Sequence, residues 1–286
     1  MAFIPPAFLN TVVPIGVSDV SGGIKWIGTG FLYGLFDKKI DDSNSSYTLF
    51  VVTNKHVLQG KKKVYVRFNR QGGGHEDIDI SLIARNGRTY WGQHPRADVG
   101  AFFVNSQFLS NNNLEFHFFR SDLDAYRIGK LKSEQVTEGD ELFLLGYPLG
   151  IVALEGHNVI CRGGCIARIQ DLLSGAAEEY LADAAVFPGN SGGPVLLKPS
   201  AIAIQGTKAQ NQSALVGIVK SYVPYQDVAI SQQTGNPRVM FEENTGLSYV
   251  IPVDFIDRVT QQLRRRLKQR AASARWRAKN KSGPSA

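Results

Sequence analysis

The chain lacks the features that mark secreted or membrane-spanning proteins. Its 286 residues include only two cysteines, and no apolar run approaches the ~18 residues that a membrane span requires. The N-terminus, MAFIPP, has neither a basic region nor a long apolar segment, so no signal peptide is expected. These absences predict a soluble protein that stays in the cytoplasm, where it is made.

The two cysteines, Cys161 and Cys165, lie in one predicted strand over residues 159–166. At ~3.3 Å rise per residue their Cα atoms are roughly 13 Å apart, too far for a disulfide unless the intervening Gly-Gly pair folds back. We therefore expect two reduced thiols. His157 precedes them at a loose ligand spacing, but no fourth ligand is nearby. Neither a metal site nor any other cofactor is predicted.

Composition favours a β protein with a substantial core. The chain is 43% hydrophobic and contains 29 glycines among many short Val, Ile, Phe and Tyr runs. Apolar runs of strand length that alternate with turn residues are typical of an all-β fold. A chain of this length can bury a large core, as one domain or as two coupled ones.

Acidic residues are absent from the C-terminal 29 residues. The segment 258–286 holds ten lysines and arginines, so the net charge of +7 becomes −3 when this segment is set aside. The basic character therefore belongs to the tail and not to the folded body. Between Arg264 and Lys281 the cations are dense enough to contact an anionic partner, such as a nucleic acid, a membrane surface or an acidic protein. The alternative is a solvated tail without a partner.

The stretch FPGNSGGPV at 187–195 places Ser191 in a glycine-rich turn before an apolar strand. Glycines permit positive φ angles and close backbone approach, so such a turn can expose one hydroxyl beside convergent N–H groups. That arrangement suits a nucleophile next to an oxyanion hole. The alternative is a glycine-rich hairpin without chemistry.

The order of residues along the chain narrows the chemistry of Ser191. GNSGG also fits the G-x-S-x-G turn of α/β-hydrolases, in which the catalytic histidine follows the serine. All five histidines of this chain precede Ser191. An α/β-hydrolase triad is therefore excluded, and the order histidine, acid, serine remains open.

One histidine and one aspartate stand out upstream. The stretch YTLFVVTNKHVL at 47–58 begins as an apolar strand that leads directly to His56. Asp98 immediately precedes the apolar run VGAFFV. A carboxylate at the edge of a core can accept the histidine Nδ1–H and hold its tautomer. Asp140 is a rival acid, but its Gly and Glu neighbours indicate a solvated turn. The other four histidines are interpreted as structural or solvated: His75, His94, His117 and His157.

Six motifs occur in the same order as in one known family. They are GTGF at 28–31, TNKHV at 53–57, DVGA at 98–101, LGYPLG at 145–150, DAAVFPGNSGGP at 183–194 and GLSYVIP at 246–252. Together they resemble the trypsin-like peptidase domain of the HtrA (Deg) type, within the chymotrypsin-like superfamily. The resemblance spans about residues 11–263. No PDZ module of the kind that HtrA relatives usually carry is apparent after it.

The resemblance implies an all-β fold of two antiparallel six-stranded β-barrels with the active site between them. The first barrel is expected at about 10–115 and the second at about 130–252, with residues 105–132 crossing between them. A closing helix is expected from Pro252, because Ile256, Val259, Leu263 and Leu267 follow at helical spacing. We divide the chain into a peptidase domain at 1–258 and a basic helix and tail at 259–286.

The resemblance also implies a serine endopeptidase that acts through an acyl-enzyme. Ser191 would attack the scissile carbonyl, His56 would move the proton, and Asp98 would orient His56. The N–H groups of Gly189 and Ser191 would form the oxyanion hole. The chain departs from the family at Phe187, where a small polar residue is usual. Three alternatives stay open: a pseudoprotease that only binds peptides, a nucleic-acid-binding protein that uses the barrels as a scaffold, and a protease regulated by nucleic acid or a partner bound to the basic tail.

Specificity is expected from the pocket that receives the P1 side chain. By resemblance its walls are the strand before the serine loop and the segments 217–222 and 246–248. The candidate residues named from them are Ala185, Lys220, Tyr222, Gly246 and Ser248. Ala185 stands where trypsin has an aspartate, so the prediction is a small or medium apolar P1 residue. If Lys220 turned into the pocket it would instead favour an acidic P1 residue; otherwise it extends from the cleft edge into solvent. The insertion at 224–245 is expected to overhang this pocket.

Overall fold

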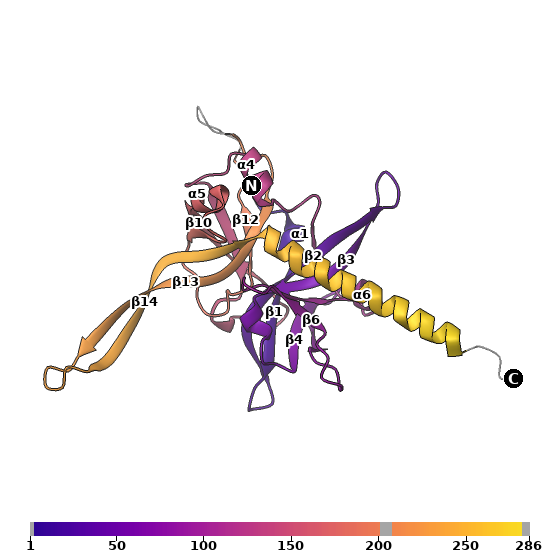
Figure 1. The fold of residues 1–286 in the computed structure, drawn as a ribbon, viewed down its shortest axis with the longest axis horizontal. Coiled ribbons are helices and arrows are strands. Elements are labelled where there is room, and N and C mark those ends of the chain that lie inside the picture. The colour runs from indigo at the N-terminus through magenta and orange to yellow at the C-terminus, as the bar shows by residue number, and fades with distance from the viewer. Residues whose placement is uncertain (1–2, 201–207, 282–286) are drawn as a thin grey trace.

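The computed structural model describes residues 3–200 and 208–281, with side chains as far as Ser273. The chain forms two β halves that pack against each other and against one long C-terminal helix (Figure 1). None of the helices in this described part is long and apolar enough to cross a membrane.

The N-terminal half is a curved sheet of eight strands in the order β5-β4-β1-β2-β3-β7-β6, with β8 paired to β2. Alternation of buried and exposed side chains sets its inner face, as in β4, where Val64, Val66 and Phe68 are buried and their neighbours are not. The strands are β1 (Val12–Ser18), β2 (Ile24–Lys39), β3 (Ser45–Thr53), β4 (Lys63–Asn69), β5 (His75–Ser81), β6 (Trp91–Gln93), β7 (Gly100–Phe103) and β8 (Phe119–Arg120).

The C-terminal half is a closed six-stranded barrel in the order β10-β11-β14-β13-β12-β9. Every neighbouring pair is antiparallel. The strands are β9 (Glu141–Gly146), β10 (Ile160–Arg168), β11 (Tyr180–Asp183), β12 (Pro194–Leu197), β13 (Ala214–Ile230) and β14 (Pro237–Pro252).

The predicted trypsin-like fold with a C-terminal helix is confirmed, with one difference in the first half. Its ladder ends on β5 and β6, so this half is a half-barrel and not a second closed ring. β6 has only three residues, too few to pair along the length of β5. Cys161 and Cys165 lie together in β10 as free thiols, as the extended strand requires.

Short helices connect the strands. They are α1 (Pro6–Leu9), α2 (Lys55–Leu58), α3 (Ser106–Asn111), α4 (Ile128–Ser133), the 3₁₀ turn η1 (Pro148–Gly150) and α5 (Gln170–Ser174). Within the expected crossover at 105–132 lie α3, β8 and the start of α4. The parallel pairing of β8 with β2 fastens this crossover to the first half.

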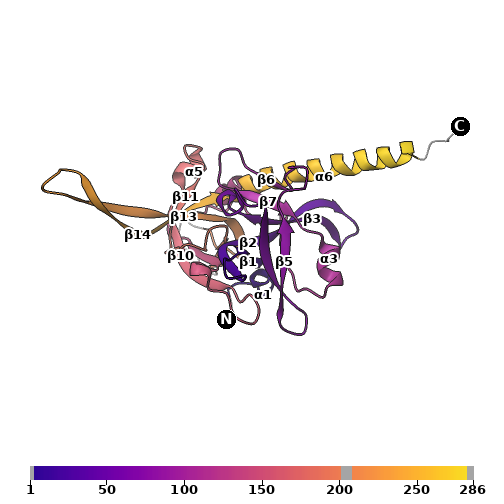
Figure 2. The ribbon, with the colours of Figure 1, turned by 90° about the horizontal axis from the view of Figure 1, so that it is seen from below.

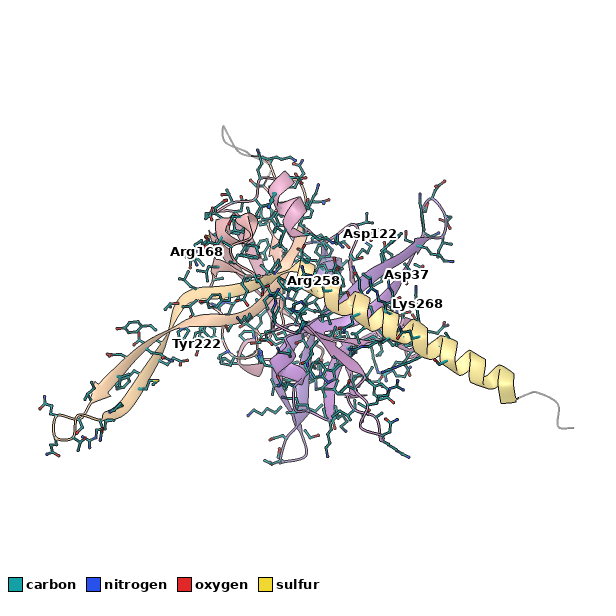
Figure 3. The ribbon with its side chains drawn as sticks, in the orientation of Figure 1. Asp37, Asp122, Arg168, Tyr222, Arg258 and Lys268 are labelled. Atoms are coloured by element: carbon teal, nitrogen blue, oxygen red, sulfur yellow. The ribbon has the colours of Figure 1, made fainter. Side chains whose placement is uncertain are left out.

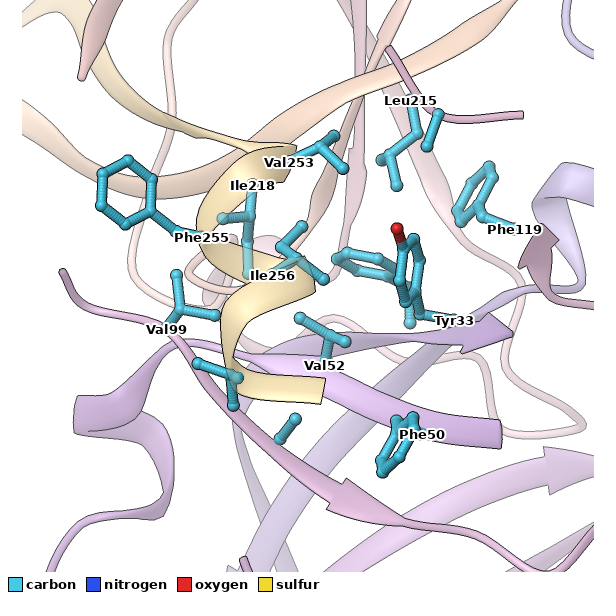
Figure 4. Close-up of a cluster of buried hydrophobic side chains, with 14 of the residues drawn as sticks. Tyr33, Phe50, Val52, Val99, Phe119, Leu215, Ile218, Val253, Phe255 and Ile256 are labelled. Carbon is cyan, nitrogen blue, oxygen red and sulfur yellow. The ribbon is translucent and has the colours of Figure 1, made fainter. Parts of the chain in front are cut away.

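The long helix α6 (Val253–Lys281) begins directly after β14 and joins the two halves. Its first turns bury Val253, Phe255 and Ile256 against strands of both halves (Figure 4). In that cluster Val52 comes from β3 and Ile218 from β13. The division drawn at residue 258 falls inside α6, since Val259 and Leu263 remain buried in the same cluster.

Two elements extend beyond the packed body at opposite ends (Figures 1 and 2). One is the C-terminal part of α6. The other is the outer part of the β13–β14 hairpin, residues 224–245, which we call the arm. The sequence predicted an overhanging insertion here. Instead, residues 224–230 pair with 237–244 as a continuation of the barrel strands, and the ribbon points away from the body.

Candidate active site

His56 and Asp98 are brought together where two neighbouring strands meet the cleft. β3 and β7 are adjacent in the sheet, with Thr53 opposite Gly100. His56 lies in α2 just after β3, and Asp98 lies just before β7. Val57 and Leu58 are buried and anchor α2. The amide of the buried Asn54 donates to the Asp98 carbonyl at 2.7 Å, which ties the two segments together.

Asp98 accepts two hydrogen bonds from His56. His56 Nδ1 lies 2.5 Å from Asp98 Oδ2, and the His56 backbone N–H donates to Oδ1 at 3.0 Å. Burial by itself raises the pKa of Asp98, but these hydrogen bonds and the charge of His56 outweigh it, so the net pKa is lowered. The carboxylate therefore stays ionised, and its two bonds fix the orientation of the imidazole. The Nε2 edge of His56 is left to face the cleft.

Ser191 lies in the loop between β11 and β12, which is pressed against both halves. The Thr29 N–H donates to the Ser191 carbonyl at 2.9 Å across the interface. Gly192 has φ 88°, and a Cβ on it would lie 2.1 Å from the Thr29 carbonyl oxygen. Only glycine fits such a contact and such a φ angle. Because residue 192 is a glycine, the backbone of the N-terminal half at Thr29 can pack directly against the serine loop.

The Ser191 hydroxyl donates to the Lys220 carbonyl at 3.2 Å. Ser191 and His56 both belong to the described range 3–200, and no hydrogen bond joins their side chains. Both line the same pocket. Rotation of the hydroxyl toward His56 is therefore needed before Nε2 can accept its proton.

Two backbone N–H groups of the serine loop are free to donate. The Pro188 carbonyl accepts a hydrogen bond from the Leu149 N–H at 2.6 Å, and the peptide is trans. The Gly189 N–H therefore points to the opposite side, away from Leu149. Within residues 3–200 and 208–281 neither this N–H nor that of Ser191 has a hydrogen-bond acceptor. Two free donors next to a hydroxyl can bind an oxyanion.

Thr29 and the turn at η1 hold this loop in place. Thr29 Oγ1 donates to the Gly189 carbonyl at 2.6 Å and accepts from the Tyr147 N–H at 3.0 Å. Leu149, whose N–H binds Pro188, adopts φ 57°, a left-handed conformation that is uncommon for leucine. The motifs GTGF and LGYPLG thus supply hydrogen-bond donors that hold the backbone of the serine loop. The sequence singled out both motifs but assigned no role to Thr29 or Leu149.

The pocket beside Ser191 has a volume of about 240 Å³ and a mainly apolar lining. Its lining residues are Ile27, His56, Val186, Phe187, Pro188, Gly189, Ser191, Val219, Ser221 and Tyr222. Among the predicted pocket residues, Tyr222 therefore faces it. Val219 and Ser221 belong to the wall segment 217–222 that the resemblance implied, and Val186 directly follows the predicted Ala185.

The side chain of Lys220 lies outside the pocket. Its Nζ pairs with both carboxylate oxygens of Glu179 at 2.8 and 2.9 Å and lies 5.3 Å from the ring centre of Tyr249. The register of β13 against β14 shifts between Val219 and Ser221, so Lys220 is the extra residue of a β-bulge, and its side chain is absent from the lining to which both neighbours contribute. Lys220 therefore contributes its carbonyl to the site and not its charge.

The other three predicted pocket residues, Ala185, Gly246 and Ser248, are not among the lining residues. Gly246 accepts from the Ala184 N–H at 2.9 Å and so joins β14 to the segment before Ser191, next to Ala185. Ser248 is fully buried opposite Ala182, and its hydroxyl has no hydrogen-bond partner within the described residues. Ala185 and Gly246 are half-buried.

Two of the remaining histidines are structural. His94 is buried, and its Nδ1 accepts from the Ala97 N–H at 2.9 Å, which shapes the turn that leads to Asp98. Burial, with a contribution from Arg258, lowers its pKa. His157 is also buried, and burial lowers its pKa to about 4. Both side chains are therefore held neutral at pH 7.

Comparison with protein families agrees with this geometry. The model of the trypsin-like peptidase domain matches residues 28–200, which is more than half of the chain. The matched range contains His56, Asp98 and Ser191. A search of curated proteins finds no match to the chain.

Proposed function

Because this chain belongs to the trypsin-like peptidase domain family, we propose that it is a serine endopeptidase whose triad is His56, Asp98 and Ser191. The observation that carries the proposal is the paired His56–Asp98 unit in one pocket with Ser191. The six motifs in order support the finer proposal that the domain is of the HtrA type.

The proposed reaction begins when Ser191 Oγ leaves the Lys220 carbonyl and donates to His56 Nε2. Oγ attacks the scissile carbonyl as Nε2 takes its proton, and Asp98 stabilises the imidazolium that forms. The N–H groups of Gly189 and Ser191 bind the oxyanion, and one such donor contributes roughly 3–4 kcal/mol of barrier lowering. His56 then protonates the leaving amine, and water hydrolyses the acyl-enzyme by the same steps in reverse order.

The proposed P1 preference is a small or medium apolar side chain. Val186 and Val219 line the pocket, and Lys220 is paired with Glu179 outside it. Among the described residues, the lining includes no lysine, arginine, aspartate or glutamate. An acidic P1 residue therefore finds no counter-charge, and a basic one finds no carboxylate. Peptide libraries that vary only P1 should give the highest kcat/KM for Ala, Val or Leu. A preference for Asp, Glu, Lys or Arg would contradict this lining.

The central test is labelling with a fluorophosphonate probe, which acylates only an activated serine. We expect the wild type to label, and Ser191→Ala and His56→Ala to remain unlabelled. Ser221→Ala is the matched control, because Ser221 lines the same pocket but is assigned no chemistry. Labelling of folded Ser191→Ala would overturn the assignment of the nucleophile.

A peptide-binding pseudoprotease is the second candidate. The observation in its favour is the hydrogen bond of Ser191 to the Lys220 carbonyl, which keeps the hydroxyl from His56. The same labelling experiment separates the two functions. A folded wild type that binds peptides but never labels would establish the pseudoprotease.

We also propose that the exposed basic face of α6 binds an anionic partner. Arg265, Arg266 and Lys268 are exposed, and within the described residues none forms an ion pair. Arg264 is different, because it pairs with Asp37 at 3.0 Å. The predicted contacts of the cations beyond residue 273 fall on side chains that lie outside the described residues.

A further inference from the structure

The arm, residues 224–245, continues the two strands that border the candidate active site. β13 contributes Val219, Ser221 and Tyr222 to the pocket and then runs on to Ile230 without leaving its partner β14. At ~3.3 Å per residue, the stretch from Tyr222 to Ile230 is about 26 Å long. Figure 3 labels Tyr222 near the base of the arm. One strand thus leads from the pocket outward into solvent.

The edge of β13 that leads away from Ser191 is unpaired along the arm. Up to Val219 this edge is occupied, because Gly192 and Gly193 exchange hydrogen bonds with Val219 at 3.0 and 2.9 Å, and β12 pairs with residues 214–218. Beyond Val219, within the described ranges, β13 has ladder partners only in β14. Between Tyr225 and Ala229 the register is regular, so the free N–H and C=O groups alternate as in an ordinary strand edge.

Pro224 and the register shifts at Val219/Ser221 and Tyr222/Pro224 interrupt the edge next to the pocket, and its regular part begins at Tyr225. Residues 225–230, YQDVAI, contain no lysine and no proline, and their only charge is Asp227. The outer arm also exposes large apolar side chains on both faces. Ile230 and Met240 are each 62% exposed and Phe241 is 54% exposed. An unprotected edge flanked by apolar side chains is a surface suited to adding a further strand.

The proposed function decides which part of a substrate lies along this edge. His56 protonates the leaving amine, so the residues after the scissile bond lie over His56. The acyl part lies on the other side of Ser191, where the Lys220 carbonyl and Tyr222 begin the edge of β13. The segment that precedes the scissile bond is therefore directed along the arm.

We propose that the arm is an extended binding platform for protein substrates. The segment N-terminal to the scissile bond passes the irregular stretch at Pro224 and then adds to the regular free edge of β13, Tyr225–Ala229, as an antiparallel strand. Backbone hydrogen bonds give affinity with little dependence on sequence, and the exposed apolar side chains favour apolar residues in the substrate. The substrates are then proteins with an unfolded or extended segment of about ten residues before the cleavage site. This inference rests on the proposed function.

The test shortens the arm and leaves the pocket intact. Gln226 and Glu242 are directly opposite, so replacing residues 227–241 with Asn-Gly closes the hairpin in its existing register. The change keeps the hydrogen bond between the Tyr222 hydroxyl and Glu242. The matched control replaces residues 40–44 with Asn-Gly between the paired Lys39 and Ser45, which shortens a different exposed hairpin.

The readout is kcat/KM for peptides that share one cleavage site and differ in length before it. In the wild type and the control, kcat/KM should rise about tenfold as this segment grows from four to twelve residues, because successive backbone bonds form along the edge. In the arm-shortened protein it should level off after about six residues. Fluorophosphonate labelling and turnover of the shortest peptide should be equal in all three proteins.

The outcomes separate this inference from the proposed function. Equal length dependence in the wild type and the arm-shortened protein would overturn the platform. Sedimentation that shows a wild-type dimer and an arm-shortened monomer, together with unchanged length dependence, would assign the arm to a second copy of the chain instead. Loss of labelling in the wild type would overturn the proposed function itself.

Discussion

At the scale of single residues, the site depends on which partner holds each reactive group. Asp98 fixes His56 through two hydrogen bonds, whereas Ser191 is held by a carbonyl and not by His56. The sequence identified these three residues from chain order and from the residues around them. It could not identify the Lys220 carbonyl, because a backbone group leaves no signature in the sequence.

Replacement of Asp98 by asparagine tests the orientation of His56. The amide cannot accept the Nδ1–H as the carboxylate does, so the imidazole is held in the wrong tautomer and its cation is not stabilised. We expect kcat to fall about 10⁴-fold at pH 7 with KM little changed. Steady-state kinetics on a cleavable peptide measure both values.

The control for this prediction is Asp140→Asn, the rival acid. Asp140 accepts from the Thr137 N–H at 2.9 Å in a turn before β9 and is assigned no chemistry. The Asp140→Asn protein should retain wild-type kcat. An Asp98→Asn protein that keeps kcat within tenfold of the wild type would remove Asp98 from the triad.

At the scale of elements, the segment from Tyr147 to His157 braces the serine loop against the N-terminal half. The Leu149 N–H binds Pro188, and at the other end the His157 N–H donates to Asn69 Oδ1 at 2.9 Å. The Tyr147 hydroxyl lies 3.0 Å from His157 Nδ1 and donates to the Val12 carbonyl at 3.1 Å. A proton on His157 would therefore disturb the segment that positions the proposed oxyanion hole.

His157 makes the stability of the fold depend on pH. Burial lowers its pKa from 6.5 to about 4 in the folded state, so between these pH values the unfolded chain binds the extra proton. The stabilising contribution is complete above pH 6.5 and is lost as the pH falls toward 4. The loss is up to about 3 kcal/mol of unfolding free energy.

Urea unfolding at pH 7, 6, 5 and 4 measures this contribution. His157→Gln should be less stable than the wild type at pH 7 but should lose less unfolding free energy between pH 6.5 and 4. His117→Gln, which changes an exposed histidine, is the control and should follow the wild type. If the unfolding free energies of His157→Gln and the wild type fell by the same amount with pH, the lowered pKa of His157 would be refuted.

At the scale of the whole molecule, α6 serves two purposes along its length. Its first turns close the core between the halves, and they also carry a buried polar junction. The Tyr33 hydroxyl donates to Asp257 Oδ1 at 2.6 Å, and Arg127 Nε donates to Oδ2 at 2.5 Å. After Leu263 the helix exposes most of its surface, so its cations are available to a partner. Lys268 marks this part of α6 in Figure 3.

The exposed cations of α6 should make nucleic-acid binding sensitive to salt. We expect the wild type to bind a single-stranded RNA 20-mer at low salt. Removing three cations in Arg265→Gln/Arg266→Gln/Lys268→Gln should reduce the slope of log K against log salt by about 2. Fluorescence anisotropy at several salt concentrations measures the slope.

Lys132→Gln/Arg238→Gln is the control, because it removes exposed cations from α4 and from the arm, which extends from the body at the end opposite to the C-terminal part of α6. It should leave the slope unchanged. Binding to phosphatidylserine vesicles but not to RNA would assign the face to a membrane surface. An equal slope in the triple variant and the wild type would show that α6 does not contact the phosphates.

The sequence by itself determined the fold class, the closing helix and the order histidine, acid, serine, because these depend on local patterns. Alternation of apolar residues specifies strands, the spacing of Ile256, Val259 and Leu263 specifies a helix face, and the glycines around Ser191 specify a tight turn. The closed second barrel and the start of α6 accordingly appear where the sequence predicted them.

Only the tertiary structure decided where the side chains and free edges point. Lys220 turns to Glu179 because it lies in a β-bulge and a carboxylate is nearby, and Glu179 is 41 residues away in sequence. Thr29 reaches Gly189 across 160 residues. The arm extends from the body because residues 224–244 keep pairing beyond the barrel. Such contacts join residues that are far apart in the chain, so no local pattern records them.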